Sequence, residues 1–151
     1  MKNKKTFTFR RFGRRDVNGV FNLLQNLSNK NKEFFHPHKF DEKTLLKNLE
    51  SDDHYFIMTA DDKIIGYSFL RLFGFDIPSF GCCIRNGFEN KGYGSILTGL
   101  TIEKAKELGY KKVILKTYKK NLFAQKIYNK LGFKIIGETS DKKQYKMILE
   151  F

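Results

Sequence analysis

The chain has 151 residues, 40% of them hydrophobic, which is enough apolar material for one compact core, and we expect a single domain over residues 1–151. No stretch approaches the ~18 uncharged apolar residues of a membrane-spanning helix, and the first residues lack the apolar run of a signal peptide, which predicts a cytoplasmic protein without membrane contact. The net charge of +13 would attract polyanions, but its 29 Lys and Arg residues form no basic run, so no specific nucleic-acid binding is expected.

Hydrophobic spacing in the first half predicts alternating strands and helices. The expected elements, in chain order, are a strand at 6–11, a helix at 16–27 with Asp16 as its N-cap, a helix at 41–50, and a hairpin of strands 55–60 and 64–72 that turns at 61–63. The segment 31–40, rich in Phe and His, is expected to be a loop.

The second half continues the mixed pattern. It is expected to contain a strand at 80–85, a long amphipathic helix at 92–108 ended by Gly109, a strand at 112–117, a helix at 122–131 ended by Gly132, and an antiparallel pair at 133–137 and 144–150. Strands outnumber helices, so the fold class is α+β with a mixed sheet. The adjacent Cys82 and Cys83 cannot link separate parts of the chain or form a cysteine zinc site, and we interpret them as small buried hydrophobes.

A glycine-containing turn, residues 89–95, precedes the long helix. Gly92 and Gly94 allow a tight turn, and the start of the helix adds unpaired N–H groups and the positive end of its dipole, which favours a bound diphosphate. A dinucleotide fingerprint is excluded because Leu97 stands where a third glycine is required, and a P-loop is excluded because the GKS or GKT sequence is missing.

A second pattern, NxxAxxxYxxxGF, begins at Asn121. Tyr128 lies seven residues later, about two helical turns away, so both side chains project from one side of the helix with the small Ala124 between them. Taken alone, Tyr128 is typical of a core tyrosine with a solvated hydroxyl. The helix and strand that separate the two motifs allow the turn and the second helix to line one cleft.

The two motifs together resemble those of the GCN5-related N-acetyltransferase (GNAT) family, whose cofactor turn has the form (Gln or Arg)xxGx(Gly or Ala). The resemblance covers residues 80–137 closely. It implies a six- or seven-stranded, mostly antiparallel sheet, splayed between its fourth and fifth strands and flanked by about four helices, with acetyl-CoA inserted in the splay. No metal is implied.

The resemblance also implies roles for individual residues. Backbone groups of Cys83 and Ile84 would pair with the pantetheine arm of acetyl-CoA, Asn121 would bond to it from the opposite side, and Tyr128 would be the general acid. The amides around residues 91–95 would hold the pyrophosphate; these residues are Lys91, Gly92, Tyr93, Gly94 and Ser95.

Two positions differ from the family pattern. Glu89 replaces the usual Gln or Arg, and we interpret it as facing solvent, with Lys91 compensating its charge. Ser79 stands where many members have a glutamate as general base, which leaves Asp76, His36, His38 or a water chain as candidates.

The expected activity is transfer of an acetyl group from acetyl-CoA to a primary amine, on a small molecule or an amino sugar, by direct attack. The alternatives are an acetyltransferase of protein N-termini or lysines, a non-catalytic acyl-CoA-binding module, and a basic nucleic-acid-binding protein, which would lack a reading motif. Homodimers are common in the family, so a homodimer is included among the expected partners together with the amine acceptor.

Overall fold

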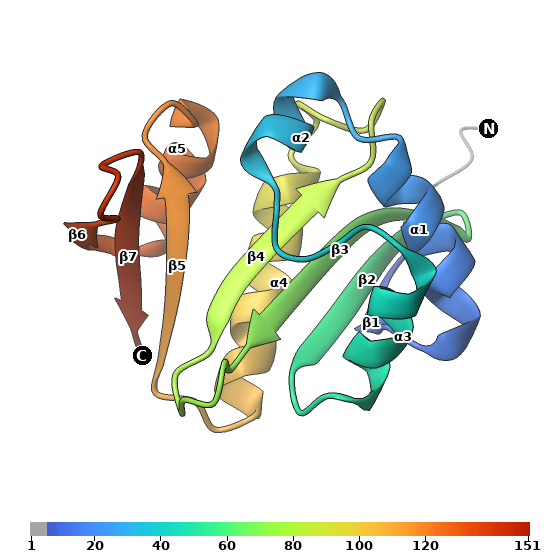
Figure 1. Cartoon of the computed structure of the whole chain (residues 1–151), viewed down its shortest axis with the longest axis horizontal. Coiled ribbons are helices and arrows are strands. Elements are labelled where there is room, and N and C mark those ends of the chain that lie inside the picture. The colour runs from blue at the N-terminus through green and yellow to red at the C-terminus, as the bar shows by residue number, and fades with distance from the viewer. Residues whose placement is uncertain (1–5) are drawn as a thin grey trace.

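The computed structural model describes residues 6–151 (Figure 1). The prediction that the chain has no signal peptide concerns its first residues. Of these, residues 1–5 lie outside the described residues. Among residues 6–151, no helix is long and apolar enough to cross a membrane.

Seven strands form one sheet in the order β1-β2-β3-β4-β5-β7-β6. The elements of the first half are β1 (Phe7–Arg11), a 3-10 turn (Arg14–Asp16), α1 (Val17–Gln25), α2 (Asn29–Phe34), α3 (Glu42–Glu50), β2 (His54–Ala60) and β3 (Lys63–Arg71). Those of the second half are β4 (Ser79–Ile84), α4 (Tyr93–Glu107), β5 (Lys112–Tyr118), α5 (Leu122–Leu131), β6 (Lys134–Glu138) and β7 (Gln144–Glu150).

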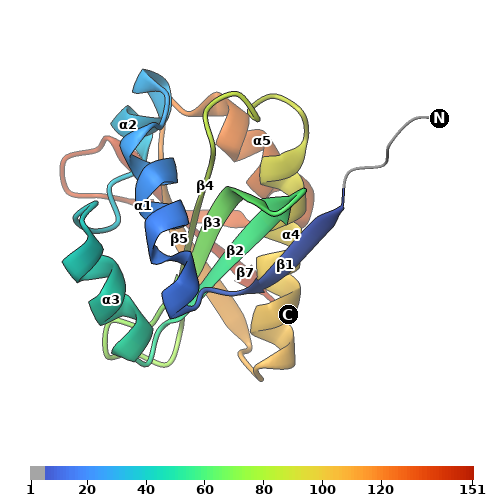
Figure 2. The same cartoon turned by 90° about the vertical axis from the view of Figure 1, so that its right-hand side faces the viewer.

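The helices cover both faces of the sheet. Figure 2 shows α1, α2 and α3 on one side, which we call the front, and α4 and α5 on the other, which we call the back. Core side chains alternate between the two faces: Tyr67 and Cys83 pack with α1 and α3, whereas Phe80 and Val113 pack with residues of α4 and α5.

The pairing of β4 with β5 is the exception in an otherwise antiparallel sheet. These two strands run parallel and are in register at one position only, Ser79 with Ile114. The adjoining bond, from the Ile114 N–H to the Pro78 carbonyl, measures 3.0 Å. Beyond this point the strands diverge, which confirms the expected splay between the fourth and fifth strands.

The predicted elements agree with the structure to within about two residues, with one omission. Helix α2 was expected to be part of a loop, because its sequence NKNKEF is polar and the helix buries none of its residues. Its N-cap is Ser28, whose hydroxyl accepts from the Asn31 N–H at 3.2 Å. Five α-helices are therefore present in the described chain, one more than expected.

Asp16 precedes α1 as predicted, but its side chain does not cap the helix. Its buried carboxylate instead accepts hydrogen bonds from Arg10 Nη1 at 2.7 Å, from Arg10 Nη2 at 2.8 Å and from the Gly13 N–H at 2.8 Å. The prediction of a capping role was wrong because the arginine of the preceding strand competes for both oxygens. Asp16 thus joins β1 to the start of α1.

Replacing Asp16 with Asn should destabilise the fold by about 1–3 kcal/mol at pH 7, because the buried site loses its bonds to a charged partner. Burial alone would raise the pKa of Asp16, but the bonds from Arg10 and Gly13 outweigh it and the net pKa is lowered. This stabilisation is present above the unfolded pKa of about 3.9 and is lost as the pH falls through the folded value. Denaturant unfolding at pH 7 and pH 3 should therefore show a smaller difference between the two proteins at pH 3.

The matched control is Asp62→Asn, which changes an exposed turn carboxylate. A difference between wild type and Asp16→Asn that is as large at pH 3 as at pH 7 would contradict the assigned role of the carboxylate.

Candidate active site

The segment between β4 and α4 is fixed to the front of the molecule by Arg85. Its buried guanidinium donates to the Ile64 carbonyl at 2.6 Å, to Asn22 Oδ1 at 2.8 Å and to the Gly19 carbonyl at 3.3 Å. The chain then turns through left-handed conformations at Asn90 (φ 59°) and Gly92 (φ 87°) before α4 begins. Gly92 is the N-cap of α4, where a larger residue would be strained.

This turn presents a row of unpaired backbone donors. Within residues 6–151, none of the backbone N–H groups of residues 89–95 donates a hydrogen bond. The ammonium groups of Lys63 and Lys91 lie 5.7 Å and 5.8 Å from the centre of the Phe88 ring and add positive charge beside the turn. Free amides, lysines and the positive end of α4 together fit a bound diphosphate.

Gly94 borders the space between the end of β4 and α5. A Cβ atom added there would lie 3.7 Å from Ile127 Cδ1 and 3.9 Å from Ile84 Cγ1, which are ordinary contacts. A side chain at this position is therefore compatible with the fold and would occupy space next to the turn.

The splay leaves one edge of β4 without a strand partner. The Arg85 N–H donates to the Ile65 carbonyl of β3. In an antiparallel pair every second residue turns its backbone groups to the partner strand, so those of Cys83, two residues before Arg85, also face β3. The backbone groups of Cys82 and Ile84 then face the gap toward β5. Of the two residues expected to pair with pantetheine, Ile84 has backbone groups that face the gap, whereas those of Cys83 face β3.

The side chains of the two cysteines are inert in this setting. Both are free thiols, Cys83 buried on the front and Cys82 half-buried with its sulfur 3.8 Å from Thr98 Oγ1 on the back. Burial raises the pKa of Cys82 to about 11 and that of Cys83 well above the usual value, so both stay protonated. This agrees with their interpretation as small hydrophobic residues.

Helix α5 begins on the opposite side of the gap. Asn121 is its N-cap, and its Oδ1 accepts from the Ala124 N–H at 3.3 Å. The carbonyl end of this amide is thus engaged within the protein, and the Nδ2 group is left to bond a ligand.

Tyr128 lies on the back, between β4 and the β5 half of the sheet. Its ring contacts Phe80 of β4 at a centroid distance of 6.2 Å and Phe133 at 5.7 Å, both edge to face. Its hydroxyl has no hydrogen-bond partner among residues 6–151. Burial, with a smaller contribution from Cys82, raises the pKa of Tyr128 well above the usual 10 of a phenol. The phenol therefore stays protonated and has a proton to donate.

Glu89 does not face solvent, which corrects the interpretation from the sequence. It is half-buried, and its Oε2 accepts from Asn31 Nδ2 at 3.0 Å and from Ser28 Oγ at 3.3 Å. The prediction failed because its partners belong to α2, the helix that the sequence pattern did not reveal. Glu89 joins the turn at residues 89–95, which we call the diphosphate turn, to the N-terminus of α2.

The three residues considered as general base are dispersed. His36 is exposed and bonds to the Glu33 carbonyl, whereas His38 lies between α3 and β3 with Nδ1 bonded to the Lys39 carbonyl and Nε2 to the Tyr67 hydroxyl. Burial lowers the pKa of His38, so its neutral form is favoured in the core. Neither histidine has a ring contact or hydrogen bond with Tyr128.

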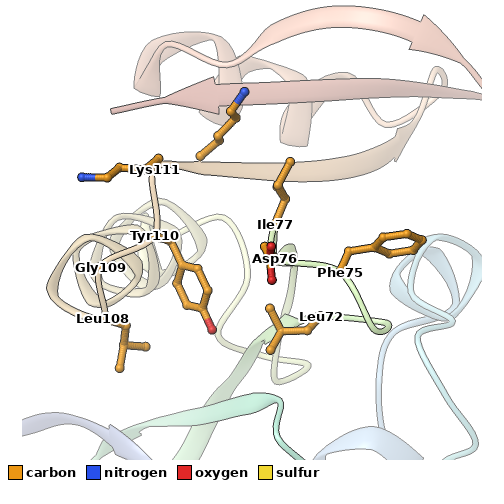
Figure 3. Close-up of a pocket in the computed structure, with 9 residues that line it drawn as sticks. Leu72, Phe75, Asp76, Ile77, Leu108, Gly109, Tyr110 and Lys111 are labelled. Carbon is orange, nitrogen blue, oxygen red and sulfur yellow. The ribbon is translucent and has the colours of Figure 1, made fainter.

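The third candidate, Asp76, points into a pocket of about 430 Å³ with Tyr110 and Leu72 (Figure 3). This pocket lies at the N-terminal ends of β4 and β5, whereas the diphosphate turn follows the C-terminal end of β4. None of the three candidates is therefore assigned as a base.

Replacing Glu89 with Ala should loosen α2, because this helix buries no residue of its own and loses two hydrogen bonds at its N-terminus. Hydrogen exchange of a peptide covering residues 28–35 should become faster than in wild type. The matched control is Glu33→Ala, which removes an exposed carboxylate from the same helix. Equal exchange in wild type and Glu89→Ala would show that Glu89 does not hold α2.

Comparison with known proteins agrees with this geometry. The model of the acetyltransferase (GNAT) family matches residues 21–133. A ribosomal-protein-S5-alanine acetyltransferase from Vibrio fischeri is similar in structure, with TM-score 0.83 and 16% identity, over 98% of this chain and 97% of that one.

Two further similar structures have the same fold. A GNAT-family acetyltransferase from Streptococcus pneumoniae has TM-score 0.78 and 21% identity over 97% of this chain and 100% of that one. A spermidine N-acetyltransferase from Vibrio cholerae, in complex with CoA and spermine, has TM-score 0.78 and 20% identity over 95% of each chain. Because the family model spans more than half of the sequence, the chain belongs to the GNAT acetyltransferase family, whose acetyl donor is acetyl-CoA.

Proposed function

We propose that this acetyltransferase acts on the primary amine of a small molecule or amino sugar and binds acetyl-CoA in the gap between β4 and β5. The observation that carries the proposal is the position of this gap, which leaves the edge of β4 unpaired between a row of free amides and a protonated phenol. Backbone groups that lack a partner are costly to bury, and a ligand with amide groups of its own can satisfy them.

Different residues around the gap bind different parts of acetyl-CoA. The amides of Lys91, Gly92, Tyr93, Gly94 and Ser95 hold its pyrophosphate. Cys82 and Ile84 offer backbone groups to the pantetheine arm, and Asn121 Nδ2 approaches from the α5 side. These assignments rest on the unpaired groups described above.

Bound acetyl-CoA supplies a thioester that a neutral amine can attack directly. An N–H group on the free edge of β4 donates a hydrogen bond to the carbonyl oxygen as that oxygen gains negative charge. The Tyr128 hydroxyl then protonates the departing thiolate. Burial raises the pKa of the neighbouring Cys82 thiol as it does that of the phenol, so a thiolate that departs into this gap also gains proton affinity. The amine nitrogen becomes positively charged when the C–N bond forms and then loses one proton to water, which balances the proton that Tyr128 gives to the thiolate as the C–S bond breaks.

A protein N-terminus or lysine is the alternative acceptor. A similar structure is that of an acetyltransferase for a ribosomal protein. Helix α2 favours a small acceptor, because Phe34 packs against Tyr118 at the end of β5 while Asn31 bonds to Glu89 beyond β4. The helix thus spans the front of the splay and leaves less room for an acceptor to reach the gap between β4 and β5. A non-catalytic module is disfavoured by the presence of Tyr128 with an unbonded hydroxyl.

We further propose that residues 1–151 form one domain, since the similar structures are matched over nearly their whole length, and that this domain is cytoplasmic, as the composition of the sequence predicts. One of the similar spermidine N-acetyltransferases is a dodecamer, and self-association of this chain, as a homodimer, belongs to the same proposal.

Replacing Tyr128 with Phe should lower turnover by about 10²-fold or more, because the proton donor is removed while the ring contacts with Phe80 and Phe133 remain. The measurement is steady-state acetyl transfer together with calorimetric titration of acetyl-CoA, whose affinity should be unchanged. Because the pKa of Tyr128 is raised above 10, ionisation of its phenol should not lower wild-type activity at any pH below 10. Unchanged turnover in the variant would remove Tyr128 from the mechanism.

Replacing Gly94 with Val should abolish acetyl-CoA binding, because the Cβ atom makes only ordinary contacts with Ile127 and Ile84 while the added methyl groups occupy the space beside the turn. Calorimetric titration of wild type should show saturable binding of acetyl-CoA and none of ATP, which serves as a polyanion control. Equal weak binding of both ligands, insensitive to Gly94→Val, would contradict the assigned cofactor site.

A further inference from the structure

The front of β5 and β7 carries no helix. In Figure 1, α1 and α3 lie in front of β1, β2 and β3, and α2 lies in front of the C-terminal end of the splay, whereas β5 and β7 are uncovered on this side. We call this surface the open face and define it by Ile114, Lys116 and Tyr118 of β5 and Lys146 and Ile148 of β7.

The register of the sheet places these residues on the front. Ser79 and Ile114 are paired in parallel strands, so their side chains share a face with Cys83, which packs on the front. Lys116 and Tyr118 follow at alternate positions on the same face. The contact between Tyr118 and Phe34 of α2, at 5.6 Å between ring centres, agrees with this placement.

Lys116 lies at the edge of the splay. Continuing the β4–β5 register two residues beyond Ser79 and Ile114 brings Gly81 opposite Lys116 across the gap. Gly81 belongs to the stretch of β4 whose neighbours, Phe80 and Cys82, border Tyr128 from the back. A group bound by Lys116 would therefore lie at the front of the gap, and Tyr128 lines the same section of the gap from the back.

The two lysines of the open face are not balanced by acidic residues. Lys116 and Lys146 are directly opposite each other in the β5–β7 register, and both are exposed. Neither ammonium group forms an ion pair or a hydrogen bond within the part of the chain that the structure describes. Like charges at directly opposite positions destabilise a sheet.

The remaining lysine of these strands has an acidic residue opposite it: Lys112 is paired with Glu150 in the same register. Lys119, which directly follows β5, forms an ion pair of 2.9 Å with Glu138. Lys116 and Lys146 are therefore the lysines of β5 and β7 that have no acidic residue opposite them. An anion bound between the two ammonium groups would relieve their repulsion.

We propose, on the basis of the acetyl transfer proposed above, that Lys116 and Lys146 bind an anionic group of the acceptor, so that the substrate is a small amine that also carries a carboxylate or a phosphate. Both anions suit lysine, which binds as a flexible point charge. The half-buried Ile114 and Ile148, which are paired beside the lysines, offer an apolar surface to the carbon skeleton of the acceptor. A polyamine with several ammonium groups would be repelled by this face.

The experiment compares kcat/KM for matched amines that differ only in the anionic group. The pairs are 4-aminobutyrate with 4-aminobutanamide for a carboxylate, and glucosamine 6-phosphate with glucosamine for a phosphate, with spermidine as the polycation. In at least one pair the anionic member should be preferred by about tenfold or more, the effect of one hydrogen bond between charged groups. The pair that shows the preference identifies the anion.

The variant K116E/K146E should reverse that preference while its KM for acetyl-CoA stays unchanged. The matched control is Lys47→Glu, a charge reversal at an exposed position of α3, which should keep the wild-type preference. Unchanged KM for acetyl-CoA also shows that the double variant is folded.

Three results would overturn the proposal. Equal use of both members of each pair, preference for spermidine, or transfer only to an acidic peptide would each exclude a small anionic acceptor while leaving acetyl transfer intact. If acetyl-CoA binds but no amine is acetylated, the proposed function itself fails, and the assignment of the acceptor fails with it.

Discussion

The single point of contact between β4 and β5 is the constraint on which the site depends. Two parallel strands that meet only at Ser79 and Ile114 leave backbone groups of both strands without partners beyond that point. Side-chain packing, rather than strand pairing, holds β1–β4 against β5–β7. Phe80 of β4 packs in one cluster with Val113 and Leu115 of β5 and with Phe133, and Tyr128 packs against this cluster. The gap is therefore stable without strand pairing and open to a ligand that supplies the missing bonds.

The gap also separates the two halves of the proposed reaction. Gly94, at the start of α4, and the Tyr128 phenol adjoin the back, where a cofactor bound through its pyrophosphate would enter. The open face and α2 adjoin the front, where the acceptor would enter. The free backbone edge of β4 lies between the two sides, where charge would develop as the acetyl group is transferred.

Much of this arrangement could be predicted from the sequence, because it follows from local patterns. The alternation of apolar residues located all seven strands, and Gly109 and Gly132 marked the ends of α4 and α5, where both adopt positive φ angles. The two motifs around Gly92 and Tyr128 located the turn and the phenol. Each of these features is encoded within a few neighbouring residues.

The remainder depends on contacts between distant residues, which periodicity does not encode. Helix α2 has no apolar stripe, so the partners of Glu89 could not be predicted from periodicity. The carboxylate of Asp16 was expected to cap its own helix, but Arg10 of the neighbouring strand provides a stronger partner. The choice between Cys82 and Cys83 as the residue facing the gap depends on the strand register, which only the folded sheet defines.

A crystal structure of the protein with coenzyme A tests the proposed site most directly. The pyrophosphate should lie on the amides of residues 91–95, and the pantetheine arm should lie between β4 and β5 with bonds to Cys82 and Ile84. The thiol sulfur should lie within hydrogen-bonding distance of the Tyr128 hydroxyl. Coenzyme A bound elsewhere, for example across the lysines of the open face with the gap between β4 and β5 filled by side chains, would contradict the proposed site.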